Sequence, residues 1–127
     1  MGEAAKSLLV VEDEDNIALA LEHLMRREGY RLSRVANGAE AMSAITRDHP
    51  DLVLLDVMLP EVSGYEICQS VRLDPALADV KILMMTARGN QMERRKGLAL
   101  GADGFISKPF DAADLKAEVK RLLGDPA

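Results

Sequence analysis

Three short apolar runs place the strongest limit on how this chain can fold. Each run lacks polar alternation and ends at or just before a polar side chain, and the runs span 7–11, 51–56 and 80–85. A strand that is apolar along its whole length is typical of a parallel sheet with helices on each side. The runs therefore predict strands that are covered on both faces.

Expected strands and helices alternate along the whole chain. Apolar residues recur at helical spacing after the first run, as in Ile17, Leu21 and Met25, and Gly29 ends that helix. The expected strands lie at 7–11, 30–35, 51–56, 80–85 and 104–107. The expected helices lie at 15–29, from 38, from 64, at 88–100 and through 115–123. This alternation predicts an α/β fold with a parallel sheet between two layers of helices.

The composition is typical of one globular domain. The net charge of −5 argues against a broad nucleic-acid-binding face. No apolar run approaches the roughly 20 residues that span a bilayer. The single cysteine, Cys68, excludes an internal disulfide and fits a reducing compartment. We therefore expect one cytoplasmic domain over residues 4–124, without a membrane segment.

Four of the expected strand ends carry groups that are suited to chemistry. Glu12 and Asp13 follow the first strand, and Asp56 closes the third. Thr86 follows the fourth strand, and Lys108 follows the fifth. In an open parallel sheet, ligands bind outside the carboxyl ends of the strands. The sequence therefore predicts a site of three acids, one hydroxyl and one amine at a single edge of the sheet.

This set of groups is suited to phosphoryl transfer. Three crowded carboxylates repel one another unless a cation or protons neutralise them, and oxygen-only ligands favour a hard ion such as Mg²⁺ that keeps several waters. Lys108 and Thr86 supply a positive charge and a hydroxyl donor for phosphoryl oxygens. Asp56 is a competent acceptor and would form an acyl phosphate.

Each residue taken alone also has a simpler explanation. An acid after a strand is often a helix N-cap, and Asp15 is expected in that role. His23 and His49 have no suitably spaced partners and are expected on helix surfaces. Cys68 is expected as a small helix residue that faces the core. Asp56 is the exception, because a carboxylate that closes a buried strand needs a partner.

Four separated motifs resemble the receiver domains of bacterial response regulators over essentially the whole chain. They are LLVVEDE at 8–14, DLVLLDVMLP at 51–60, TA at 86–87 and GADGFISKPF at 101–110. All four stand in the family's order and spacing. The resemblance implies a flavodoxin-like (βα)5 doubly wound fold whose five parallel strands have the order 2-1-3-4-5.

The resemblance also implies roles for the acids. Asp56 would be the phosphoacceptor, and together with Asp13 it would ligate Mg²⁺ directly. The backbone carbonyl of Met58 would join that set, while Glu12 would act through water. The side chains of Met58 and Arg88 are expected to flank the phosphoryl group and shield it from water, which predicts slow self-dephosphorylation.

A conformational switch is implied in the same way. Lys108 would pair with the phosphoryl group, and Thr86 would move to hydrogen-bond it. Phe105 matches the family's switch aromatic, which turns inward as Thr86 moves, and the Lys108-Pro109 peptide would be cis. The movement would alter the face formed by the helix at 88–100, the strand at 104–107 and the last helix. The polar first half of the helix at 88–100 indicates that it is weakly anchored and can move.

The resemblance implies a signalling phosphoacceptor rather than an enzyme, although it would assist its own phosphoryl transfer and dephosphorylation. The donor would be a phosphohistidine on a sensor histidine kinase or a phosphotransfer protein. Gly104 and Glu118 stand where DNA-binding dimers of the family carry an acid and an arginine. We therefore expect a monomer or a weak phosphorylation-dependent dimer, with no direct contact to nucleic acid by this domain.

Other interpretations stay open or are disfavoured by single residues. The chain shows no output domain, so it is a stand-alone receiver, part of a longer regulator or hybrid kinase, or a docking receiver that is not phosphorylated. A metal-dependent phosphohydrolase often has a second Asp two residues after its nucleophile, where this chain has Met58. A flavodoxin-like FMN carrier needs a Gly-rich or hydroxyl-rich loop after its first strand, whereas the acids at 12–15 would repel phosphate.

Overall fold

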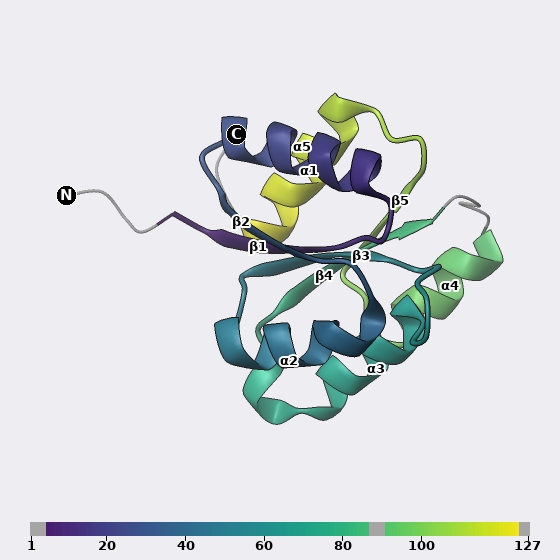
Figure 1. Ribbon diagram of the computed structural model, residues 1–127. Helices are drawn as coiled ribbons and strands as arrows, with labels where there is room; N and C mark the ends of the chain where they lie inside the picture. The colour runs from purple at the N-terminus through teal and green to yellow at the C-terminus, as the bar shows by residue number, and fades with distance from the viewer. Residues whose placement is uncertain (1–4, 87–90, 125–127) are drawn as a thin grey trace.

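Figure 1 shows a sheet that lies between two layers of helices. The computed structural model describes residues 5–86 and 91–124. Five parallel strands form one sheet in the order β2-β1-β3-β4-β5. They are β1 (Ser7–Val11), β2 (Arg31–Val35), β3 (Leu52–Asp56), β4 (Lys81–Thr86) and β5 (Gly104–Ser107). The predicted fold class and strand order are confirmed.

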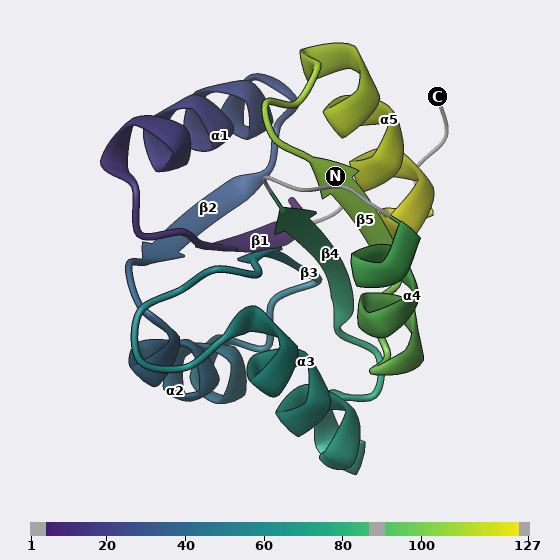
Figure 2. The same ribbon diagram turned by 90° about the vertical axis from the view of Figure 1, so that its right-hand side faces the viewer.

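Helices cover both faces of this sheet. On one face lie α1 (Asp15–Arg27) and α5 (Ala112–Leu123), and on the other lie α2 (Gly38–Asp48) and α3 (Gly64–Leu73) (Figures 1 and 2). The short helix α4 (Gln91–Ala99) lies beside β5 on the side of α3. Within the described residues, no helix has the length and apolar character needed to cross a membrane.

The central strands are apolar along their whole length because both of their faces are buried. In β1 and β3, alternate residues enter different cores. Leu9 and Val53 pack in the core beneath α2 and α3. Leu8 and Leu54 pack in the core beneath α1 and α5. The edge strand β2 is only partly buried, as its alternating sequence predicts.

The N-cap of α1 differs from the prediction by one residue. Glu14 is the N-cap, without a side-chain capping hydrogen bond, and Asp15 is the first helical residue. The Asp15 carboxylate instead receives a hydrogen bond from Arg34 on β2, at 2.9 Å between Oδ1 and Nη1. The prediction that Asp15 caps the helix is therefore wrong. The ion pair with Arg34 could not be foreseen, because it joins segments that are distant in the sequence.

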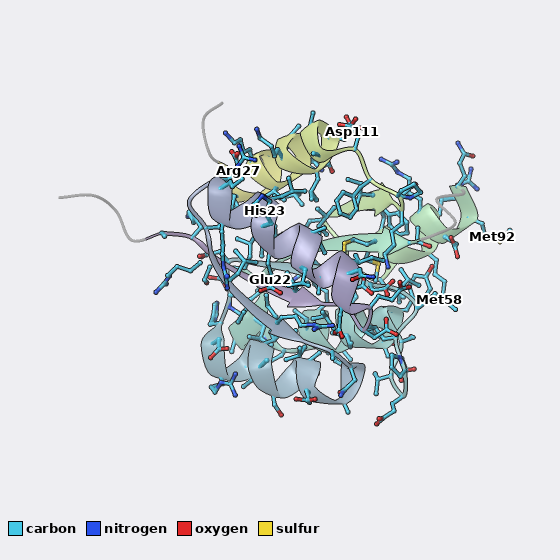
Figure 3. All side chains as sticks on the ribbon, turned by 45° about the horizontal axis from the view of Figure 1, so that its top comes forward. Glu22, His23, Arg27, Met58, Met92 and Asp111 are labelled. Atoms are coloured by element: carbon cyan, nitrogen blue, oxygen red, sulfur yellow. The ribbon has the colours of Figure 1, made fainter. Side chains whose placement is uncertain are left out.

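Two further details differ from the prediction. A short 3-10 helix, Pro75–Leu77, follows α3 and is capped by the Asp74 side chain. His23 lies on the exposed outer side of α1, as expected (Figure 3). His49 is also at the surface, but its ring nitrogen lies 2.8 Å from Asp79, so it has a partner that its spacing in the sequence does not reveal.

Helix α4 is held by an unusually small apolar contact. Gly97 is the buried residue of this helix, whereas its neighbours are exposed or half-buried. A Cβ atom at position 97 would lie 2.8 Å from the Phe105 ring and 2.9 Å from the Met84 sulfur. The glycine therefore lets α4 approach β4 and β5 closely, but it contributes little apolar area of its own. The expected first residues of this helix, from 88, lie outside the described ranges.

The reactivity of the Cys68 thiol reports on the packing beneath α3. Its side chain is fully buried, and desolvation raises the pKa of the thiol to about 11. Because the thiolate is the reactive form, we expect the native protein at about pH 8 to react with a disulfide reagent roughly 100-fold more slowly than the urea-unfolded chain. Reaction at equal rates in the native and unfolded protein would contradict this packing.

Candidate phosphoacceptor and metal site

The structure brings the predicted acids together at one edge of the sheet. Glu12 and Asp13 follow β1, and Asp56 is the last residue of β3. Since β1 and β3 are adjacent and parallel, their carboxyl ends meet at the same edge. One carboxylate oxygen from each of the three acids lies within 4.8 Å of the others. This part of the prediction is confirmed by the geometry.

Lys108 joins this cluster from the loop after β5. Its ammonium group donates a hydrogen bond to Glu12 Oε1 at 2.8 Å and lies 3.2 Å from Asp56 Oδ2. The Lys108-Pro109 peptide is cis, as the resemblance implied. Glu12 is fully buried, Asp56 is 4% exposed, and the Lys108 side chain is 13% exposed. The site therefore contains three acids and one ammonium group, two of the acids with little access to water.

Burial controls the charge state of these groups. Desolvation raises the pKa of Glu12, and the nearby Asp56 adds to this, although the hydrogen bond from Lys108 opposes it. Desolvation likewise raises the pKa of Asp56 against the attraction of Lys108. Desolvation acts to lower the pKa of Lys108, but its contacts with Glu12 and Asp56 raise it overall. Lys108 therefore stays charged, whereas the two buried acids are only partly compensated.

An all-oxygen cluster with excess negative charge fits a hard divalent cation. Carboxylates without His or Cys are the ligand set that Mg²⁺ prefers, and the excess charge of the three acids over Lys108 would be reduced by such an ion. Asp13 is exposed and can be reached from solvent, whereas Glu12 is enclosed. The cluster is thus open to an ion on the side of Asp13 and closed to solvent on the side of Glu12.

Arg34 is a residue of the site that sequence reasoning missed. It lies on β2, where its guanidinium donates to the backbone carbonyl of Glu12 from Nε at 3.0 Å and from Nη2 at 2.8 Å. With its third contact to Asp15, it fixes the acidic loop from both ends. The signal lies in the register, because Arg34 pairs with Val10 on β1, two residues before Glu12. That register is available only when the strand order is known.

The loop after β3 is shaped by the approach of α3. The backbone N–H of Met58 donates to Asp56 Oδ1 at 3.2 Å, which orients the carboxylate. A Cβ atom at Gly64 would collide with the carbonyl oxygen of Asp56, so a glycine is required where α3 begins. The Met58 side chain is 73% exposed and projects outward at the same end of the molecule as Met92 (Figure 3).

Thr86 and Phe105, the two residues expected to form the switch, are both buried. The Thr86 hydroxyl donates to Glu93 Oε1 on α4 at 3.1 Å. Phe105 is 7% exposed, and its ring lies against Gly97. Arg88, the other expected shielding residue, lies outside the described residues.

Residues 8–120 match the family model described as the response regulator receiver domain. This chain belongs to that family. The phosphate regulon transcriptional regulatory protein PhoB of Rhizobium meliloti (strain 1021) is 41% identical over 116 residues, which are 91% of this chain and 51% of that protein. The chain spans about half the length of the curated relatives it matches.

Solved receiver domains have the same fold. The receiver domain of the sensor histidine kinase PA1611 from Pseudomonas aeruginosa PAO1, solved with a magnesium ion coordinated in its active site cleft, is 31% identical with a TM-score of 0.87. That match covers 96% of this chain and 100% of the other. The receiver domain of a signal transduction histidine kinase from Syntrophus aciditrophicus is 35% identical with a TM-score of 0.87, covering 94% of this chain and 91% of the other. Receiver domains like this one thus occur in named transcriptional regulators and in histidine kinases.

The crowding of charge in this receiver domain predicts an effect on stability. In EDTA at neutral pH, we expect Asp56→Asn to raise the free energy of unfolding by on the order of 1 kcal/mol, because it removes one buried negative charge and leaves Lys108 paired with Glu12. Thermal unfolding followed by circular dichroism measures this as a higher melting temperature. Mg²⁺ is expected to raise the melting temperature of the wild type more than that of the variant.

The control for this measurement is Asp114→Asn, which removes an exposed carboxylate from the first turn of α5. We expect its melting temperature to follow the wild type with and without Mg²⁺. A lower melting temperature for Asp56→Asn in EDTA would show that the carboxylate stabilises the domain rather than straining it.

Proposed function

We propose that Asp56 of this receiver domain accepts a phosphoryl group from a phosphohistidine on a sensor histidine kinase or a phosphotransfer protein. The observation that supports this most is the place of Asp56 at the end of β3, 4% exposed and 3.2 Å from the Lys108 ammonium group. The backbone N–H of Met58 holds one of its oxygens, which leaves the carboxylate oriented at the edge of the sheet.

The transfer step follows from these groups. One carboxylate oxygen of Asp56 attacks phosphorus as the P–N bond of the phosphohistidine breaks. The electron pair of that bond returns to the imidazole nitrogen, which takes up a proton. The products are an acyl phosphate on Asp56 and a neutral histidine. Lys108 would stabilise the charge that spreads over the phosphoryl oxygens, at transfer and again when water removes the group.

We infer that Mg²⁺ is the ion that this step requires. Asp13, Asp56 and the Met58 backbone carbonyl would hold it, and Glu12 would act through a water. When bound, such an ion neutralises negative charge on the phosphoryl oxygens. The inference is supported by the oxygen-only cluster and by the magnesium ion named in the solved receiver domain of PA1611.

We further propose that phosphorylation changes the face made by α4, β5 and α5. Thr86 would turn to the phosphoryl group, and Phe105 would adjust with it. Gly104 offers no side chain on this face, and Glu118 is bound at both oxygens by Arg121 of its own helix, at 2.9 Å each. These features favour a monomer or a weak phosphorylation-dependent dimer that does not contact nucleic acid directly.

The proposed receiver domain covers residues 4–124, somewhat more than the matched 8–120. We place it in the cytoplasm, where a buried free thiol such as Cys68 stays reduced and where histidine kinases act. It would serve as a stand-alone receiver or as part of a longer regulator or hybrid kinase. Its downstream effector would read the switched face rather than Asp56 itself.

Incubation with acetyl phosphate and Mg²⁺ tests the proposed function. We expect intact mass spectrometry to show the gain of one phosphoryl group by the wild type and none by Asp56→Asn. Asp114→Asn is the matched control, because it changes an exposed aspartate and should be phosphorylated as the wild type is. If the wild type gains nothing from acetyl phosphate or from a phosphorylated partner, the domain is a docking receiver instead.

The lifetime of the acyl phosphate tests the proposed shielding role of Met58. We expect slow self-dephosphorylation in the wild type, because the long side chain next to the acceptor excludes water from one side of the phosphoryl group. Met58→Ala should shorten the half-life several-fold, as measured by intact mass after the phosphodonor is removed. Loss from the wild type within seconds in Mg²⁺ would contradict the shielding role.

A further inference from the structure

The Thr86 hydroxyl is engaged by a residue outside the metal and phosphoacceptor cluster. Thr86 closes β4 and is 1% exposed, and its hydroxyl donates to Glu93 Oε1 at 3.1 Å. Glu93 belongs to the first turn of α4. The contact therefore ties the end of the sheet to α4, the α-helix with the fewest buried residues among those that the structure describes.

Glu93 lies near α3 as well as β4. Burial raises the pKa of the Tyr65 hydroxyl on α3, and the negative charge of Glu93 adds to this effect, so the two groups are close. Lys96, three residues after Glu93, lies over the Tyr65 ring at 4.4 Å from its centroid. Glu93 is half-buried, whereas Arg94 and Arg95 beside it are exposed. Its carboxylate is turned toward β4, where it accepts the hydrogen bond from the Thr86 hydroxyl.

A hydroxyl group has one proton to donate. Thr86 can give that proton to Glu93 or to a phosphoryl oxygen, but not to both at full strength. A phosphoryl group on Asp56 also adds roughly 1.5–2 negative charges, and Asp56 pairs in the sheet with Met85, the residue before Thr86. Both effects make the contact between Thr86 and Glu93 unfavourable once the group has arrived.

We propose that Glu93 is a positioning residue for Thr86. Its carboxylate holds the Thr86 hydroxyl toward α4 and competes with the phosphoryl group for the hydroxyl proton. The inference rests on the proposed function, because it concerns how readily the phosphorylated state forms. Glu93 acts through Thr86 and does not touch the reacting atoms. The stronger the hydrogen bond that Glu93 accepts from Thr86, the more free energy is lost when that bond breaks on phosphorylation.

Affinity for beryllofluoride, an acyl phosphate mimic, measures this competition in the intact domain. We expect Glu93→Ala to tighten binding in excess Mg²⁺ by about fivefold or more, the range of ordinary coupling between two groups. Glu93→Gln keeps a neutral carbonyl acceptor and should give a smaller increase, because hydrogen bonds to charged acceptors are the stronger ones. Titration followed by amide NMR spectra gives the dissociation constants, and melting temperatures confirm that each variant is folded.

A double-mutant cycle with Thr86→Val separates positioning from a general charge effect. In the Thr86→Val background, Glu93→Ala should change the affinity by no more than about twofold, since the hydroxyl that Glu93 holds is gone. Glu66→Gln is the matched control, because it removes an exposed carboxylate from the first turn of the neighbouring helix α3 and should leave affinity unchanged.

Three results would overturn the inference. Unchanged or weaker binding by both Glu93→Ala and Glu93→Gln would show that Glu93 does not compete for the proton. An equal gain in the Thr86→Val background would show that only its charge matters. Failure of the wild type to bind beryllofluoride at all would overturn the proposed function and this inference together, which distinguishes that case from the other two.

Discussion

The ammonium group of Lys108 is the contact on which the site depends. It joins Glu12, 96 residues away in the chain, to Asp56, and both acids are almost completely buried. Without that positive charge, two buried carboxylates beside Asp13 would not both stay ionised. The parallel order of β1, β3, β4 and β5 is what brings these groups to one edge. The strand order therefore determines both where these charged groups lie and how their charges balance.

The same fold combines a well-packed strand, β3, with a helix, α4, that needs less free energy to move. β3 is buried at each of its positions and lies between two apolar cores, so Asp56 projects from the best-packed strand of the domain. α4 has Gly97 as its buried residue and relies on polar contacts through Glu93 and Lys96. Segments with few buried apolar contacts open at the lowest free energy. A signal that begins at Asp56 would therefore move α4 more readily than β3.

Much of this arrangement follows from the sequence, for a physical reason. Apolar runs such as 51–56 report burial directly, and a strand end in a parallel sheet fixes where Glu12, Asp56 and Lys108 must meet. What escaped prediction depends on side-chain partners that are remote in the chain. Arg34 reaches the Glu12 carbonyl only through the register of β2 on β1, and Glu93 reaches Thr86 only through the packing angle of α4. The N-cap of α1 and the partner of His49 were missed for the same reason.

The contact between Thr86 and Glu93 also bears on how a partner would read this domain. Relatives of this receiver domain include a transcriptional regulator and histidine kinases, so similar sites are joined to different readouts. On α4, Met92 is 80% exposed and Leu98 is 44% exposed, an apolar surface on the helix that holds Thr86. Coupling between two sites is reciprocal. A partner that binds α4 more tightly after Glu93 releases Thr86 must therefore also favour the phosphoryl group on Asp56, whichever protein that partner belongs to.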